Sequence, residues 1–410
     1  MTVDTSLKKK NDATDVVIVG GGLAGAALAL LLRRRTNKAG LPFRVTMIEA
    51  VELPAINETP FTPSFDARST ALSAGTLDIF SQLGIVDDLL PYASDISLVH
   101  VSRRGRPGIA KISAREENIP RLGAVVENRW LGRVLLNRVR ADEGITVIAP
   151  DSAERVKRLS DGYQVTLRSG RELRCALLVA ADGAQSRTRE MLGIAAEHND
   201  SGHDAIIANI GLTQPHDGHA FERFVDDGPL AMLPMTNERC ALVWTGPRAR
   251  LDALMQLPDD KFLAEVQTQF GDRLGPLASI GKRDRYPLVL TRSFAQAIPY
   301  AVVVGNAAHT LHPVAGQGFN LTLRDLCLLA DKINGAEHPG DLKHLQAFAQ
   351  QREADQALIS KVSKWLPDLF RIQFGGVSHA RQLGLIAFDV LPSVRSRFAS
   401  KAMGFANGLE

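Results

Sequence analysis

Cysteine is scarce in this chain, with only three residues among 410. Cys175, Cys240 and Cys327 are widely spaced, and no two of them form a CxxC pair or another metal-binding pattern. Such usage is typical of proteins in reducing compartments. The sequence therefore predicts neither disulfide bonds nor a metal site.

A long hydrophobic run is also missing. The longest one, residues 23–32, is about half of the roughly 20 residues that a helix needs to cross a bilayer. Lys8 to Lys10 stand in the polar segment 1–14, but no apolar core follows them directly, as a secretion signal would require. We expect a cytoplasmic protein that touches a membrane at most at its surface.

Neither sign of charge is in large excess. There are 48 Lys and Arg against 45 Asp and Glu, and no basic block is interleaved with aromatic residues, so we expect no nucleic-acid partner. The 45% hydrophobic and 23% charged residues are ordinary for a globular protein. A chain of this length can bury two cores, which predicts a pair of domains.

The N-terminal motif joins a strand to a helix. The apolar run 15–19 leads into Gly20-Gly-Gly-Leu-Ala-Gly25, which fits G-x-G-x-x-G with Gly20, Gly22 and Gly25 at the named positions and Leu23 and Ala24 between them. These glycines allow a tight turn, the approach of a pyrophosphate and close packing of helix on strand.

A second strand, residues 43–48, ends in Glu49, which comes 24 residues after Gly25. A carboxylate at this place can accept hydrogen bonds from the hydroxyls of an adenosine ribose and would repel a 2′-phosphate. With strand, helix, second strand and acid all in place, the segment predicts an adenine dinucleotide site rather than a glycine turn without a ligand.

Three later segments carry polar residues at the ends of apolar runs. Arg68 precedes a predicted helix, where it suits either a ligand phosphate or ring edge or, equally well, a solvated surface. Asp182-Gly183 follows the apolar run 176–181. The run 301–304 ends at Gly305 and Asn306, and Gly316 and Gly318 then precede a helix that contains Asn320. The free N–H groups at such a helix start favour an anionic ligand atom.

The rest of the pattern divides the chain. Turn signals at Asp161-Gly162 and Ser169-Gly170 separate three predicted strands, and residues 205–245 predict an antiparallel sheet. We predict an α/β fold with a discontinuous dinucleotide-binding domain, an inserted substrate domain with a mixed, largely antiparallel sheet, and C-terminal helices. Their residues are 15–95, 127–195 and 290–340 for the first, 96–126 and 196–289 for the second, and 341–410 for the third.

With these motifs in order, the chain resembles the group A flavoprotein aromatic hydroxylases. It is most similar to their ubiquinone-biosynthesis branch, which includes the 2-polyprenyl-6-methoxyphenol hydroxylases. The resemblance covers nearly the whole chain, from the dinucleotide fingerprint to Arg352-Glu-Ala-Asp355. It implies an FAD-binding Rossmann-type domain of the glutathione-reductase and p-hydroxybenzoate-hydroxylase kind.

The resemblance implies one non-covalent FAD and NAD(P)H as a transient co-substrate, because the only dinucleotide fingerprint is already used for FAD. The residues that it implies in cofactor binding are Gly20, Gly22, Leu23, Ala24, Gly25, Glu49, Arg68, Asp182, Gly183, Gly305, Asn306, Gly316, Gly318 and Asn320. Asn306 departs from the Asp of the wider family, but its amide oxygen can still accept from a ribityl hydroxyl. No catalytic acid or base is identifiable, and His309 and His312 are assigned no proton-transfer role.

The implied activity is hydroxylation of the ring of a polyprenylated phenol with NAD(P)H and O2. Alternatives are another flavoenzyme of this fold, such as a different aromatic hydroxylase, a prenyl reductase or a halogenase, or a non-enzymatic escort-type binding protein. A plain NAD dehydrogenase would need only the first motif, Gly20 to Gly25. It would not need the second motif, Asp182-Gly183, or the third motif, Gly305 to Asn320.

The substrate's apolar tail raises the question of how the enzyme meets it. Residues 358–409 combine basic and apolar side chains, which suit either the inner membrane surface or a complex for ubiquinone biosynthesis. An equally well supported alternative is that residues 358–409 form helices that cover the hydrophobic core.

Overall fold

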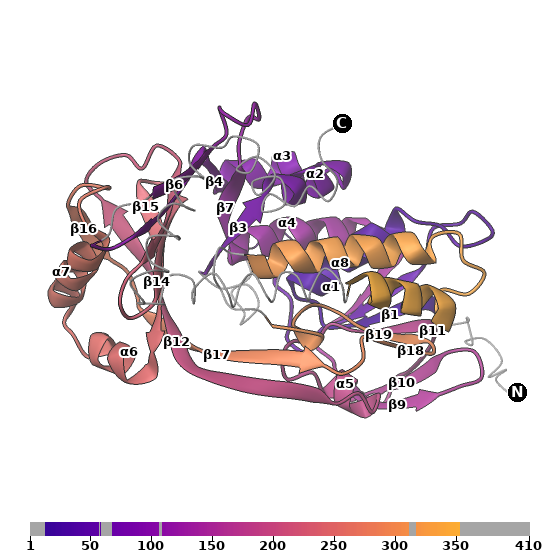
Figure 1. Ribbon diagram of the computed structural model, residues 1–410. Helices are drawn as coiled ribbons and strands as arrows, with labels where there is room; N and C mark the ends of the chain where they lie inside the picture. Colours follow the sequence, from indigo (N-terminus) through magenta and orange to yellow (C-terminus); the bar gives the residue numbers. More distant parts are fainter. Residues whose placement is uncertain (1–12, 57, 59–67, 106–108, 311–316, 353–410) are drawn as a thin grey trace, which may run out of the picture.

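The computed structural model describes residues 13–56, 58, 68–105, 109–310 and 317–352. Two large sheets lie apart from each other (Figure 1). The long strands β12 (Ala196–Leu212) and β17 (Asp284–Ser293) pair antiparallel and run from one large sheet to the other. The α/β class with a second, largely antiparallel sheet is confirmed.

The first sheet is parallel at its centre, in the order β18-β19-β11-β1-β2-β8, with β18 as an antiparallel edge strand. Its central strand is apolar on both faces, and residues 16–19 are all buried, as expected where both faces are covered. The strands are β1 (Ala13–Val19), β2 (Val45–Ile48), β8 (Ile145–Ile148), β11 (Glu172–Ala180), β18 (Ala297–Ile298) and β19 (Ala301–Val303).

Helices cover one face of this sheet. α1 (Leu23–Arg33) packs between α8 (Gln317–Ile333) and α4 (Asn128–Ala141), and its residues 25–32 are all buried. The alanines of α1 let the neighbouring backbones approach closely. The shorter helices are α2 (Ala74–Gln82), α3 (Val86–Leu89), α5 (Arg187–Met191) and the 3-10 turns η1 (Leu90–Tyr92) and η2 (Gly305–Ala307).

A hairpin covers the other face. β9 (Ala153–Arg158) and β10 (Tyr163–Leu167) pair antiparallel with each other, and β10 pairs with the start of β11. Their apolar side chains pack against Val17 and Val19 of β1. Both turns fall at the Asp-Gly and Ser-Gly dipeptides, so these two sequence predictions are confirmed.

The second large sheet has the order β16-β12-β15-β14-β13-β5-β6, and β17 also pairs with β12. All pairs are antiparallel except β13 with β5. Two helices that the sequence analysis missed, α6 (Arg248–Met255) and α7 (Asp259–Phe270), pack on one face. The remaining strands are β5 (Leu98–Arg103), β6 (Ile109–Ser113), β13 (His219–Phe224), β14 (Pro229–Met235), β15 (Arg239–Pro247) and β16 (Leu277–Ile280).

A small third sheet packs on the other face of the second sheet. It has the order β3-β7-β4, with β3 (Ser69–Ser73), β7 (Gly123–Glu127) and β4 (Ala93–Ile96) all antiparallel. Ala71 and Val125 of this sheet pack with Ala220 and Ala241 of the second sheet. The third sheet thus connects the second sheet to the helices of the first.

The domain boundaries expected from the sequence stay a prediction. In the structure, the end of the segment 96–126 belongs to β7, which pairs with β3 and β4 rather than with the second sheet. Residues 342–352 are helical, whereas the basic and apolar segment 358–409 lies outside the described residues. Within the described part of the chain, no helix is long and apolar enough to cross a membrane.

Asn320 holds the third sheet on α8. Its side-chain oxygen accepts from Ser73 N at 2.9 Å and from Thr76 Oγ1 at 2.8 Å, and its Nδ2 donates to Ala71 O at 2.8 Å. The residue is 2% exposed. A single buried side-chain amide therefore supplies hydrogen-bond partners to backbone groups at the junction of β3 and α2.

We predict that Asn320→Ala lowers the free energy of unfolding of the apoprotein by about 3 kcal/mol, because buried polar groups left without a partner cost about 1–3 kcal/mol each. Urea denaturation measures this change. The matched control is Asn334→Ala, since Asn334 accepts from Thr36 N at an exposed site and should change stability by about 0.5 kcal/mol at most. Equal effects of the two variants would contradict the assigned role of Asn320.

Candidate functional site

The glycine turn after β1 is packed too tightly for side chains. A Cβ on Gly25 would lie 1.8 Å from Gly20 O, and one on Gly20 would lie 2.4 Å from Ala181 O. Gly20 also has a φ of +109°, which L side chains rarely adopt. Only glycine at these two positions lets α1 start directly against the ends of β1 and β11.

The start of α1 offers free backbone N–H groups. Its N-cap is Gly22, which has no side chain to cap them, and the first intrahelical bond runs from Ala26 N to Gly22 O at 2.9 Å. The N–H groups of Leu23, Ala24 and Gly25 precede that bond. Together with the positive end of the helix dipole, they form a site for a phosphate anion.

Glu49 lies beside this turn. Its Oε2 accepts from Gly21 N at 2.7 Å and its Oε1 from Val51 N at 3.1 Å. A Cβ on Gly21 would lie 2.9 Å from Glu49 Cβ, so a glycine is needed there too. A carboxylate has about four lone-pair sites. Glu49 therefore keeps acceptor capacity for hydroxyl groups of a ligand while the backbone fixes its orientation.

Asp182 organises its own loop. Its Oδ2 accepts from Thr188 N at 3.0 Å and Thr188 Oγ1 at 2.9 Å, and its Oδ1 accepts from Ser186 Oγ. Gly183 next to it borders open space, since a Cβ there would meet no atom within 4 Å. The backbone at Gly183 is thus the part of this motif that a ligand can reach, and the role of Thr188 was not visible in the sequence.

Arg189 ties the second motif to the third. It is 1% exposed, and its Nη1 donates to Ala307 O at 2.9 Å and to Ala184 O at 3.3 Å. The sequence analysis did not include Arg189 among the candidate residues. A buried guanidinium that spans two separate motifs identifies it as the residue that fixes their spacing.

The third motif lies directly on the first. Gly305 is buried with a φ of +60°, and a Cβ there would lie 3.2 Å from the Ala24 side chain at the start of α1. Asn306 is exposed, and Gly318 is exposed in the first turn of α8, where a Cβ would meet no atom within 4 Å. Gly316 lies outside the described residues. The Asn320 side chain is engaged by β3 and α2, as described above.

Arg68 is half-buried rather than fully solvated. Its guanidinium lies over the ring of Tyr286 in β17, 4.8 Å from the ring centroid, and its carbonyl accepts from Asn128 N at 2.8 Å. Arg68 therefore links the start of β3 to the strand that runs between the two large sheets.

His309 is buried next to an ion pair. Asp325 lies 2.5 Å from Arg352 Nε and 3.9 Å from His309 Nε2. Burial, and then the charge of Arg352, lower the pKa of His309 to about 4. The imidazole is therefore neutral near pH 7 and does not act there as an imidazolium acid. His312 lies outside the described residues.

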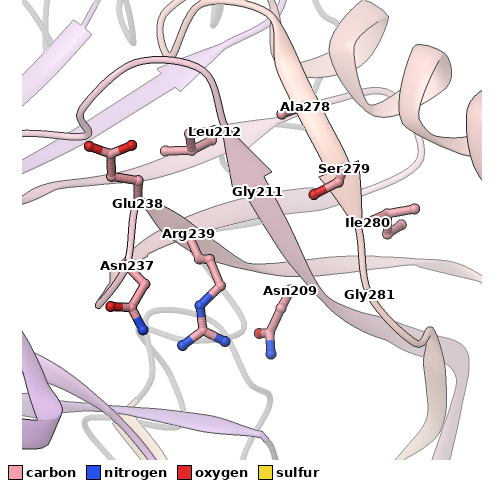
Figure 2. Close-up of a pocket in the computed structure, with 10 residues that line it drawn as sticks. All are labelled: Asn209, Gly211, Leu212, Asn237, Glu238, Arg239, Ala278, Ser279, Ile280 and Gly281. Carbon is pink, nitrogen blue, oxygen red and sulfur yellow. The ribbon is translucent and has the colours of Figure 1, made fainter.

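A pocket of about 500 Å³ lies on the second sheet, away from the glycine motifs (Figure 2). Arg239 and Asn209 are among the residues that line it. Arg239 is already bound, since its Nη2 donates to Glu127 Oε1 at 3.0 Å and its Nε donates to Thr236 O at 3.1 Å. We therefore assign this arginine a role in joining the second sheet to β7.

These residues fit an FAD. Tight glycine packing exposes one helix start for a pyrophosphate, Glu49 is held for a ribose, and Gly183 and Gly318 border open space that a ligand can fill. A Cβ on Gly305 would lie 3.2 Å from the Ala24 side chain of α1 and 3.6 Å from the Thr322 side chain of α8, so the N-terminal turns of both helices lie near the same turn. Two positive helix ends suit an anionic dinucleotide.

The family model described as FAD binding domain matches residues 13–359. The chain belongs to the family of FAD-dependent aromatic hydroxylases and is an FAD-dependent monooxygenase. It is 32% identical to the ubiquinone hydroxylase UbiL of Rhodospirillum rubrum over 85% of this chain and 82% of the relative.

A second relative and one solved structure agree with this family. The chain is 30% identical to the 3-demethoxyubiquinol 3-hydroxylase of Escherichia coli, over 88% of this chain and 93% of the relative. The crystal structure of p-nitrophenol 4-monooxygenase PnpA from Pseudomonas putida has a TM-score of 0.75 over 96% of this chain and 99% of that one. At 16% identity, this last likeness shows the fold alone.

We predict that Gly318→Ala raises the stability of the apoprotein but lowers its affinity for FAD. An alanine has room in the structure and favours the helix, so the apoprotein should gain about 0.5 kcal/mol in its free energy of unfolding. A flavin against this backbone would meet the added methyl group, so FAD affinity should fall about tenfold, as for an overpacked contact. Titration of the apoprotein with FAD by fluorescence measures the affinity, and an unchanged dissociation constant would remove Gly318 from the site.

Proposed function

We propose that this monooxygenase hydroxylates the ring of a polyprenylated phenol in ubiquinone biosynthesis with NAD(P)H and O2. The observation that carries the FAD site is the packing of Gly305 on Ala24, which brings the first and third motifs together. The substrate class is supported by the relatives, which are named as ubiquinone and demethoxyubiquinol hydroxylases and match along most of their length.

Each motif has a role toward FAD. The N–H groups at the start of α1 would hold the pyrophosphate, Glu49 the adenosine ribose, and Asn306 with the backbone near Gly305 the ribityl chain. Bound FAD supplies hydride acceptance from NAD(P)H and the activation of oxygen. The start of α8 would stabilise negative charge on the edge of the reduced ring system.

The nicotinamide cofactor is expected to bind only transiently. The chain has one G-x-G-x-x-G fingerprint, and its glycines are those of the FAD site. The exposed backbone at Gly183 lies at the end of β11, next to the end of β1, where a visiting nicotinamide could be held against FAD.

We predict that the purified holoenzyme, which should be yellow, converts a short-tailed soluble phenol to a product with one added oxygen atom. With 18O2, mass spectrometry should find the label in the product, because the inserted atom comes from O2. A prenyl reductase or an escort-type protein would give no labelled product, and that outcome would contradict the proposed function.

We further propose that residues 358–409 bring the enzyme to the inner membrane or to a biosynthetic complex. Seven basic residues in this segment are opposed by Asp368 and Asp389 alone, and they are Lys361, Lys364, Arg371, Arg381, Arg395, Arg397 and Lys401. Such a segment suits an anionic surface, which a membrane-dissolved prenyl tail would require the enzyme to reach.

Deletion of residues 376–410 tests this recruitment. We expect binding to anionic liposomes to fall while FAD content and hydroxylation of a short-tailed soluble phenol persist, because the described FAD site lies outside the deletion. Sedimentation with liposomes measures binding. Loss of FAD in the truncated protein would show that the segment covers the core, and recruitment would then depend on another surface.

A further inference from the structure

A buried carboxyl lies in the middle of β13. Glu222 is 9% exposed and lies between two residues that face the helices of the second sheet. The ring of Phe221 packs edge-on against Phe270 of α7, with centroids 5.3 Å apart, and Arg223 Nε donates to Gln269 O at 3.0 Å. Since side chains alternate along a strand, Glu222 points to the opposite face.

That face runs along the third sheet toward α8. A Cβ on Gly218 would lie 3.0 Å from Asp95 O of β4, and Ala220 belongs to the apolar cluster that contains Val125 of β7 and against which Ala71 of β3 packs. The third sheet has the order β3-β7-β4, so the next residue on this face, Glu222, lies toward the β3 edge. It lies about 7 Å beyond Ala220, two residues of extended strand.

Helix α8 binds the third sheet at its β3 edge. Asn320 of α8 donates to Ala71 O at 2.8 Å, and Gly318 lies in the same first turn of the helix. The carboxyl of Glu222 therefore lies on the face of the second sheet that carries the third sheet, and α8 binds the third sheet through Asn320. A substrate ring that meets both this face and a flavin at the start of α8 would lie between these two elements.

Among the described residues, the Glu222 carboxyl has no hydrogen-bond or ion-pair partner. Its neighbours on the adjacent strands are Ala231 and Val101, which are apolar. Burial alone raises the pKa of Glu222 to about 7. Titratable groups perturbed in this way cluster at functional sites.

The charged groups on the surrounding elements are Arg103, Arg68 and Glu127. Arg103 lies on the same face of β5, two residues beyond Val101, and Arg68 precedes β3. Glu127 ends β7 and is paired with Arg239. None of the three contributes to the shift in the pKa of Glu222, which burial alone causes.

We propose that Glu222 contacts the substrate and accepts the proton of its phenol hydroxyl. The O–H bond breaks, the proton moves to a carboxylate oxygen, and the electron pair stays on the phenolate oxygen. This raises the electron density of the ring that receives the oxygen atom. When the product ring loses its carbon-bound hydrogen as a proton to solvent water and becomes aromatic again, Glu222 returns its proton to the phenolic oxygen. This inference rests on the proposed function.

The direction of the pH dependence follows from the required charge. Glu222 can accept a proton only when it is ionised, so hydroxylation should rise as the pH increases through the pKa of about 7. A base with a pKa near the working pH is suited to proton transfer.

The experiment compares Glu222→Gln with Glu238→Gln in the holoenzyme, using a short-tailed soluble phenol. Glu238 is the matched control because it is exposed at the turn between β14 and β15 of the same sheet (Figure 2). Three quantities are measured: FAD content, the ultraviolet difference band of phenolate on binding without oxygen, and the rate of hydroxylation from pH 5 to 9.

We expect Glu222→Gln to keep FAD, lose the phenolate band, and hydroxylate at least about 100-fold more slowly, since general bases contribute about 10²–10⁴-fold. Its rate should also lose the rise near pH 7. Glu238→Gln should match the native enzyme in all three measurements.

Two outcomes overturn the inference, and they are distinguishable from failure of the proposed function. A Glu222→Gln enzyme with the phenolate band and rate of the native enzyme overturns the role of Glu222 alone. If Glu222→Gln does not hold FAD, the Glu222→Asp variant and the pH profile of hydroxylation by the native enzyme test the inference instead. A native profile without a rise near pH 7 overturns the role of Glu222. A native enzyme that oxygenates no phenol overturns the proposed function and the inference with it.

Discussion

The contact between Gly305 and the first turn of α1 is the constraint on which the site depends. A Cβ at Gly305 would lie 3.2 Å from the Ala24 side chain, and one at Gly25 would overlap Gly20 O at 1.8 Å. Strand ends, two helix starts and a turn therefore meet without side chains between them. The polar atoms that remain at this point are backbone N–H groups, which bind an anion without the cost of ordering a side chain.

Polar side chains hold this arrangement through hydrogen bonds within the protein. Arg189 joins the second motif to Ala307, Asn320 joins α8 to β3, and Asp182 binds Ser186 and Thr188 of its own loop. Each satisfies several groups that would otherwise be buried without partners. Asp182 and Asn320 stay predicted cofactor-binding residues, and in the structure their side chains also bind the surrounding protein.

The sequence allowed the strand-to-helix motifs and the two hairpin turns to be predicted because glycine and apolar runs determine local geometry. It did not reveal which side chains would bind each other across the fold. The acceptors of Arg189 lie up to 118 residues away. Glu222 was missed for another reason, since in the run His-Ala-Phe-Glu-Arg-Phe it reads as a solvent-facing charge, whereas the third sheet packs on that face of β13.

Two independent connections fix the second sheet relative to the third motif. One passes from the apolar cluster that contains Ala220 to Ala71, which packs against this cluster, and then to Asn320 in the first turn of α8. The other is the backbone of β17, where Ser293 N donates to Ala308 O at 2.8 Å and Thr310 N donates to Thr291 O at 3.0 Å. Because both connections end beside the same glycine motif, the face that carries Glu222 and the helix assigned to the flavin hold a fixed separation. Proton transfer to a buried carboxyl requires this, since donor and acceptor must stay within hydrogen-bond reach.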